Sequence, residues 1–307
     1  MPTFNKIIEE ICDELSIDYT YISKNWIMIL SYKSQVKTIS GYKFDNNTHS
    51  LGIIYDDKYA TYEYLNYLNI PAVEHELIYS DSFKEEYAKK FKGTTYLKKL
   101  FEKYQKDVVL KINNGACGRD VYHYKDFKEL NSKYHELSKK HHALSVCPYY
   151  EALNEYRLIV LNGEVVLMYK KIKPEIIGDG KSTIKDLLIE FNQEYFADYD
   201  DENKDKVLAK DEKYTYDWKF NLSRGAKMSF DISPKIKEDI VSTIQNFLKV
   251  TTGFVSIDII KTTENKYYVL EVNSGIMTDN LIKENKDGYN IAKDIYKKAI
   301  QELFNIS

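Results

Sequence analysis

Cysteine, proline and glycine are scarce in this chain of 307 residues, with counts of three, five and twelve. The cysteines Cys12, Cys117 and Cys147 are widely spaced and form no C-x-x-C pair, so neither a disulfide framework nor a zinc ribbon is indicated. A hydrophobic content of 43% argues against a disordered chain. We therefore expect a folded protein of a reducing compartment, with about two domains' worth of chain at ~150 residues each.

Excess charge and long apolar runs are also lacking. Forty-four basic and forty-seven acidic residues give a net charge of −3, so no global field draws the chain to nucleic acid or to an anionic membrane. No apolar run approaches the ~18 residues that cross a bilayer. We expect a soluble, cytoplasmic protein without membrane or nucleic-acid partners. Only three basic residues are arginine, and Arg119, Arg157 and Arg224 are therefore candidates for sites that need a planar fork.

Hydrophobic periodicity predicts helices alternating with antiparallel hairpins. Helical spacing of apolar residues occurs over 4–15, 126–140, 183–196, 234–249 and 290–304. Residues 56–70 predict an N-capped helix that ends before Pro71. Two alternating runs joined by Asn162-Gly163 predict one hairpin, and residues 254–273 predict another. The charged stretch 198–213 predicts an exposed loop or insertion. The fold class expected is α+β, with hairpins outnumbering parallel crossovers.

A lysine followed by a small-residue loop suggests phosphate binding. Lys111 lies at the end of a predicted strand, and the loop up to Arg119 contains Gly115 and Gly118. Glycines let backbone N–H groups approach phosphate oxygens, and the lysine supplies a fixed charge. The pattern is neither a P-loop nor a dinucleotide-binding fingerprint, because a strand follows the loop. Taken alone, the segment is better explained by an ordinary hairpin turn.

Three oxygen-bearing side chains lie on the last predicted hairpin. Asp258 is on the first strand, while Glu271 and Asn273 are two residues apart on the second and so share a face. Two carboxylates and an amide are ligands that suit Mg²⁺. The alternative is a solvent-facing hairpin, but the flanking residues are apolar enough to be buried, and a buried carboxylate needs a cation. The hairpin therefore predicts a metal site.

Two further segments place rare arginines beside polar residues. Arg157 opens a strand whose partner ends at Lys170 and Lys171, and Arg224 lies in the segment 221–226. Such arginines suit binding of phosphate or carboxylate. The alternatives are a structural salt bridge for Arg157 and a solvated strand end for the two lysines.

In this order the segments resemble the ATP-grasp superfamily, and most closely its branch of cyanophycin synthetases, bifunctional glutathione synthetases, RimK-like glutamate ligases and D-alanine–D-alanine ligases. The resemblance covers nearly everything from residue 56 onward. It is carried by DDK-x2-T-x3-L-x4-IP (56–71), VVLK-x3-G-x2-GRDV (108–121), EYR (155–157), IIGDGKSTIKDLLIEFN (176–192), NLSRGA (221–226) and D-x12-E-x-N (258–273). Any one segment could arise by chance, whereas the ordered set is specific.

The resemblance implies an ATP-grasp fold, in which two α+β lobes clamp a nucleotide. It implies a short N-terminal αβ domain at 1–55, a lobe with the glycine-rich loop at 56–150 and a lobe with the metal site at 151–307. The implied nucleotide-binding residues are Lys58, Lys111, Gly115, Gly118, Arg119, Cys147, Tyr149, Tyr150, Arg157 and Lys171. The implied metal ligands are Asp258, Glu271 and Asn273. The implied catalytic residues are Lys170, Asn221, Ser223 and Arg224.

The activity implied by the resemblance is that of an ATP-dependent carboxylate–amine ligase that forms an amide or peptide bond through an acyl phosphate. The cofactors would be ATP and Mg²⁺, or Mn²⁺ in its place. The substrate would be a small molecule, an amino acid or a peptide, and the assembly would be a homodimer. Two alternatives stay open: an ATP-grasp kinase that phosphorylates a hydroxyl, and a nucleotide-binding module without turnover. Three retained metal donors weigh against the module. Nucleophilic hydrolases lack a supporting motif.

Overall fold

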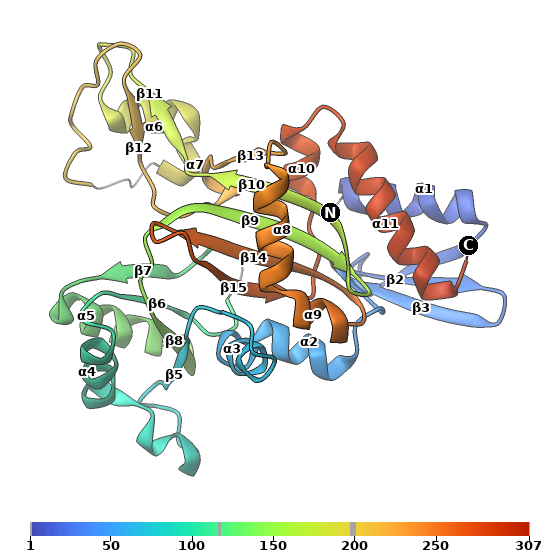
Figure 1. The fold of residues 1–307 in the computed structure, drawn as a ribbon, viewed down its shortest axis with the longest axis horizontal. Coiled ribbons are helices and arrows are strands. Elements are labelled where there is room, and N and C mark those ends of the chain that lie inside the picture. Colours follow the sequence, from blue (N-terminus) through green and yellow to red (C-terminus); the bar gives the residue numbers. More distant parts are fainter. Residues whose placement is uncertain (1, 116–117, 197–200, 307) are drawn as a thin grey trace.

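The computed structural model describes residues 2–115, 118–196 and 201–306. Three antiparallel sheets of four, four and five strands form the body of the molecule, and a two-stranded sheet projects from it (Figure 1). All strand pairs of these sheets are antiparallel, which confirms the predicted α+β class. In the described ranges, no helix combines the length and apolar character needed to cross a bilayer.

The N-terminal part packs helix α1 (Pro2–Leu15) against a four-stranded meander and against the last helix, α11 (Gly288–Phe304). Helical spacing places Ile7, Ile8 and Ile11 of α1 in this core. The strands of the meander are β1 (Asp18–Ile22), β2 (Ile27–Tyr32), β3 (Gln35–Ser40) and β4 (Lys43–Phe44). The two ends of the chain therefore share one core.

Helices α2 (His49–Asp56) and α3 (Lys58–Tyr67) follow the meander. The Thr48 side chain caps α2, and the Asp57 side chain accepts a hydrogen bond from the first turn of α3. The capped helix expected before Pro71 is thus α3. The proposed domain boundary after residue 55 falls one residue before the end of α2.

A four-stranded sheet in the order β5-β8-β6-β7, with its helices, forms what we call the N-terminal lobe. Its elements are β5 (Glu76–Tyr79), η1 (Glu86–Lys90), α4 (Gly93–Lys103), β6 (Val108–Ile112), β7 (Val121–Tyr124), α5 (Phe127–Ser138) and β8 (Ala143–Pro148). Val108 and Leu110 of β6 pack under α4 and α5. Because successive strand residues alternate in direction, Val109 and Lys111 face the other way.

A five-stranded sheet in the order β13-β10-β9-β14-β15 forms the C-terminal lobe. Its elements are β9 (Ala152–Leu161), β10 (Glu164–Ile172), β13 (Lys227–Ser229), α8 (Pro234–Thr243), α9 (Gln245–Val250), β14 (Phe254–Thr262), β15 (Tyr267–Asn273) and α10 (Asp279–Glu284). Ile257 and Ile259 pack in the core under α8 and α9. On the opposite face, Phe254 enters the N-terminal core, and Asp258 faces the N-terminal lobe.

The predicted helix at 234–249 divides into α8 and α9 at Ile244. Near this break the Thr243 hydroxyl donates to the Asp239 carbonyl one turn back, a contact that bends helices. No proline or glycine marks the break in the sequence. The single long helix predicted there is therefore wrong in this detail.

The projecting part, at the upper left in Figure 1, holds β11 (Glu175–Ile177), α6 (Ile184–Phe191), α7 (Gln193–Phe196) and β12 (Lys213–Thr215). A fully buried Leu208 packs with Ile184 and Leu188 in a small core of its own. The stretch 198–213, predicted as an exposed loop, is therefore partly structured in its described portion. Asn192 is extended and separates α6 from α7, where one helix was expected.

Candidate active site

A cavity of about 850 Å³ lies between the two lobes. Alternate residues of β6, Val109 and Lys111, line it from the N-terminal lobe, and Ser256, Asp258 and Ile260 of β14 line it from the C-terminal lobe. Period-two alternation gives each strand one face for its core and one for the cavity. Most of the predicted site residues are thus brought to a single cavity.

Two lysines approach this cavity, Lys111 from β6 of the N-terminal lobe and the partly buried Lys58 from the start of α3, which packs beside β15. Lys111 is 6% exposed, and the Lys58 ammonium donates to the Gly115 carbonyl oxygen at 2.6 Å. Asn113 joins their elements, because its side chain donates to Asp57 at 2.6 Å and its carbonyl oxygen accepts from the Lys58 N–H. Burial lowers the pKa of Lys58, and the charge of Lys111 adds to this effect. Two neighbouring cations with little exposure to solvent favour an anionic ligand.

The glycine-containing loop reaches from one lobe to the other. Gly115, Gly118 and Arg119 line the cavity, and residues 116 and 117 lie outside the described ranges. Gly118 has a φ of +64°, and a Cβ there would lie 3.0 Å from the Asn221 side-chain nitrogen. Asn221 and Ser223 also line the cavity. The loop therefore closes against the segment that the sequence singled out.

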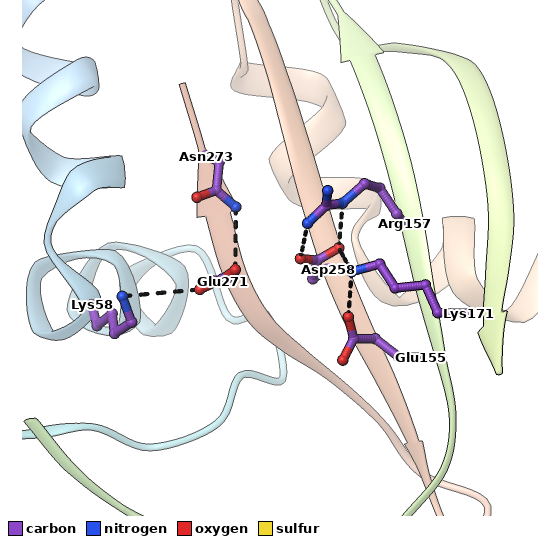
Figure 2. A network of polar contacts seen from close by, with 7 residues as sticks. All are labelled: Lys58, Glu155, Arg157, Lys171, Asp258, Glu271 and Asn273. Carbon is purple, nitrogen blue, oxygen red and sulfur yellow. Dashed lines mark hydrogen bonds and ion pairs between the residues drawn. The ribbon is translucent and has the colours of Figure 1, made fainter. Parts of the chain in front are cut away.

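Four charged side chains form a buried network on the floor of the cavity (Figure 2). Arg157 donates to both carboxylate oxygens of Asp258, at 2.8 and 2.5 Å, and Lys171 donates to one of them at 3.1 Å and to Glu155 at 2.5 Å. Burial alone would raise the pKa of Asp258, but Arg157 and Lys171 outweigh it and lower that pKa. Burial raises the pKa of Glu155 to about 7. Arg157 therefore forms a salt bridge, with Asp258, as in the alternative considered for it from the sequence.

Glu271 and Asn273 lie beside this network on the edge strand β15. Figure 2 shows Glu271 turned toward Lys58, with the two charged groups 4.0 Å apart, while the Asn273 amide lies 3.5 Å from Glu271. Their oxygens suit a divalent cation that is also bound by phosphate. Asp258, opposite Glu271 in the sheet, is already neutralised by two cations. Among the described residues, no three His, Cys, Asp or Glu side chains are grouped to hold a metal. The predicted trio therefore fits a metal through Glu271 and Asn273 more readily than through Asp258.

Aromatic rings enclose the end of the cavity near Ile260. Tyr149 stacks on His123 with ring centroids 3.9 Å apart, and Trp218 meets Tyr149 edge-on at 5.5 Å. Tyr150 and Cys147 also line this end. Burial raises the pKa of the Cys147 thiol, so it is neutral. Flat rings and a neutral thiol suit a planar base.

Two predicted catalytic residues are not among the described residues that line the cavity. Lys170 precedes Lys171 on β10, and neighbouring strand residues face opposite ways, so Lys171 is the one that enters the cavity. Arg224 lies over the Phe196 ring, with its guanidinium carbon 5.7 Å from the centroid, and its Nε is 3.8 Å from Asp217. The structure thus assigns Arg224 contacts within the projecting part.

Comparison with known proteins adds the family context. No family model matches the chain. The cyanophycin synthetase of Geminocystis herdmanii (strain PCC 6308) is 25% identical over 259 residues, which cover 84% of this chain but 27% of that protein. The D-alanyl-alanine synthetase A of Vibrio cholerae has a TM-score of 0.54 at 11% identity, over 97% of this chain and 93% of its own. The bifunctional glutathione synthetase of Pasteurella multocida has a TM-score of 0.52 at 14% identity, over 96% of this chain and 44% of its own.

This chain has the ATP-grasp fold. The resemblance inferred from the ordered motifs is confirmed, since both sequence and structure match the branch that they indicated. The chain spans about a quarter of the curated relative's length, as 27% of that protein is covered.

Sequence reasoning did not select several residues that line the cavity, and three of them are chemically distinctive. Glu155 was part of a recognised motif, yet it was not chosen because only the arginine of that motif carried a rare-residue signal. The others are Trp218 and Trp26, which line the cavity and are the chain's two tryptophans. Their rarity in a tyrosine-rich chain was the available signal.

Proposed function

We propose that the protein is an ATP-dependent carboxylate–amine ligase that forms an amide or peptide bond through an acyl phosphate. The observation that carries the proposal is one cavity lined by Lys58, Lys111, Glu271 and Asn273, in which Lys111 comes from the N-terminal lobe and the two oxygen donors from the C-terminal lobe. The similarity to a cyanophycin synthetase over 84% of the chain supports it, and so does the structural similarity to two synthetases.

Strand β14 gives the order of subsites along the cavity. Ile260, Asp258 and Ser256 line it in sequence, so they span about 13 Å at ~3.3 Å per residue. The Ile260 end has the aromatic rings, the Asp258 region has the charges, and the Ser256 end adjoins the N-terminal meander. Adenine would occupy the first, the phosphates the second and the reacting carboxylate the third.

The reaction has two steps that need little covalent help from the protein. A carboxylate oxygen of one substrate attacks the γ-phosphorus of ATP, and ADP leaves as the acyl phosphate forms. The amine of a second substrate then attacks the acyl carbon, phosphate leaves, and the nitrogen loses a proton. Lys58, Lys111 and Lys171 would offset the charge on the phosphates, and the loop ending at Arg119 would exclude water.

Glu271 and Asn273 would hold Mg²⁺ or Mn²⁺, which would supply positive charge to offset that of the phosphates. Asp258 holds Arg157 and Lys171 in place. An amino acid or short peptide as substrate, a homodimer and a cytoplasmic location remain parts of this proposal that come from the family resemblance.

The test is ADP release in the presence of Mg-ATP and a panel of acids and amines, followed by mass analysis of the products. A product equal to acid plus amine minus water supports the ligase, a phosphorylated hydroxyl supports the kinase, and no acceptor-dependent ADP supports the module. Lys111→Ala should weaken ATP binding about tenfold or more, because a charge-assisted contact contributes about 1.5–3 kcal/mol. Lys170→Ala is the matched control, a lysine of β10 outside the cavity. Equal effects of the two variants would contradict the assigned site.

A further inference from the structure

The end of the cavity that adjoins the N-terminal meander has an aromatic and apolar lining. Trp26, Tyr42 and Met277 line it, and their elements come from two distant parts of the chain. Trp26 and Met277 are 54% and 40% exposed, which is high for such large apolar side chains. Exposed apolar surface next to a charged binding site indicates contact with a ligand.

The backbone of Trp26 is hydrogen-bonded on both sides, and its indole packs against Gly41. Trp26 follows a turn and donates its N–H to the Ser23 carbonyl at 3.2 Å, while its own carbonyl accepts from the Gly41 N–H at 3.0 Å. The ring lies against Gly41, where a Cβ would come within 2.8 Å of Trp26 Cζ2. Gly41 has a φ of +59°, so this position favours glycine for both reasons. The indole therefore lies against Gly41 on one side and is exposed toward the cavity.

The charge at this end of the cavity is balanced. Lys43 is the cation there, and it is ion-paired with Asp56, which also accepts a hydrogen bond from the Ser274 hydroxyl at 3.1 Å. Ser40 and Asn280 add neutral polar groups. Lys58 and Lys111, the lysines that would offset the charge of the phosphates, lie further along the cavity. This end therefore suits an uncharged, apolar group.

The chain path places this end directly beyond the phosphate region. Asn273, on the charged part of the cavity, is two residues before Gly275, which forms a bridge with Lys43 of the meander. Met277 follows two residues later. A substrate whose carboxylate lies near Asn273 would thus extend its side chain toward Trp26 and Met277.

We propose that the site takes a carboxylate substrate with an aromatic or large aliphatic side chain, which stacks on Trp26 and contacts Met277. This inference rests on the proposed function for the reaction it serves, but the binding itself is independent of turnover. It assigns the substrate class as apolar amino acids or short peptides ending in them.

The two tryptophans provide the experiment, because they lie at different ends of one cavity. Trp218→Phe leaves Trp26 as the sole indole fluorophore, and Trp26→Phe leaves Trp218. With Mg-ADP present, phenylalanine, leucine and dipeptides of these should change the emission of Trp26, whereas glycine, aspartate and arginine should not. The inference would be overturned if phenylalanine, leucine and their dipeptides left the Trp26 emission unchanged, or if only aspartate or arginine changed it.

Kinetics separate this inference from the proposed function. Trp26→Ala should raise the KM for the apolar substrate about tenfold and change the KM for ATP less than twofold. In Trp26→Phe, which keeps an aromatic ring, the KM for the apolar substrate should rise less than in Trp26→Ala. Val36→Ala, at a 64% exposed position of the same sheet outside the cavity lining, is the control. A fluorescence response without any turnover would support the substrate pocket and reject the ligase. Turnover with the apolar KM unchanged in Trp26→Ala would support the ligase and reject the pocket.

Discussion

Replacing Asp258 with asparagine tests whether this carboxylate holds buried cations in the folded protein. Asp258 is 2% exposed and accepts three hydrogen bonds from Arg157 and Lys171. The variant would leave these two cations with Glu155 as their remaining acidic partner in the network. Breaking a buried ion pair on one side costs about 3–5 kcal/mol, because a charge is left uncompensated. At about 2 °C per kcal/mol for a large domain, the Tm should fall by about 6–10 °C.

The assay is thermal unfolding with EDTA and without nucleotide, so that no metal contributes. Glu271→Gln is the matched control on the neighbouring strand, since the Glu271 side chain is 30% exposed and its nearest ion-pair partner, Lys58, is 4.0 Å away. We expect this control to change stability by less than about 1 kcal/mol. If Asp258→Asn were as stable as the wild type under these conditions, the ion-pair role derived from the network would be refuted.

Two further outcomes concern turnover and pH. Glu271→Gln should abolish acceptor-dependent ADP release while the fold stays intact. Glu264→Gln, at the exposed turn of the same hairpin, is the control and should release ADP normally. Equal rates of ADP release in the two variants would reject the metal assignment. His75 is 2% exposed, and burial, with smaller contributions from Lys111 and Lys58, lowers its pKa well below 6.5. Below pH ~6.5, His75 therefore binds a proton in the unfolded chain but not in the folded one. The free energy of unfolding falls as the pH drops through this range, by about 1.4 kcal/mol at pH 5.5. Urea unfolding of the wild type and His75→Gln at pH 7.5 and 5.5 should show this loss in the wild type and a smaller one in the variant; an identical pH dependence would exclude His75 as the cause.

The sequence predicted well those features that depend on local patterns. The hairpin at Asn162-Gly163 formed as expected because both residues adopt positive φ, which this dipeptide tolerates better than others. Lys111 was expected only as a lysine at a strand end, and in the structure the alternation of β6 separates it from Val108 and Leu110 of the core. The same rule could not choose between Lys170 and Lys171, because the face of β10 that meets the cavity depends on its pairing with β9 and β13.

Features that depend on distant contacts were beyond local patterns. Trp26 and Met277 are about 250 positions apart in the sequence and meet only because the N-terminal meander docks against the segment after β15. Arg224 was singled out by its rarity and given a catalytic role by the family resemblance, and in the structure it contacts Phe196 and Asp217. Rarity identifies residues with special contacts, but it does not say whether the contact is with a ligand or with the protein.

The metal prediction shows how one physical requirement admits two answers. A carboxylate buried on the last hairpin needs a cation, and the sequence suggested Mg²⁺. In the structure Arg157 and Lys171 meet that requirement for Asp258, and in return Asp258 fixes the direction of both cations toward the cavity. Glu271 differs, because Lys58 is 4.0 Å away and already donates to the Gly115 carbonyl oxygen. Its charge is therefore the less compensated of the two, which ranks Glu271 above Asp258 as the residue that recruits a metal with the nucleotide.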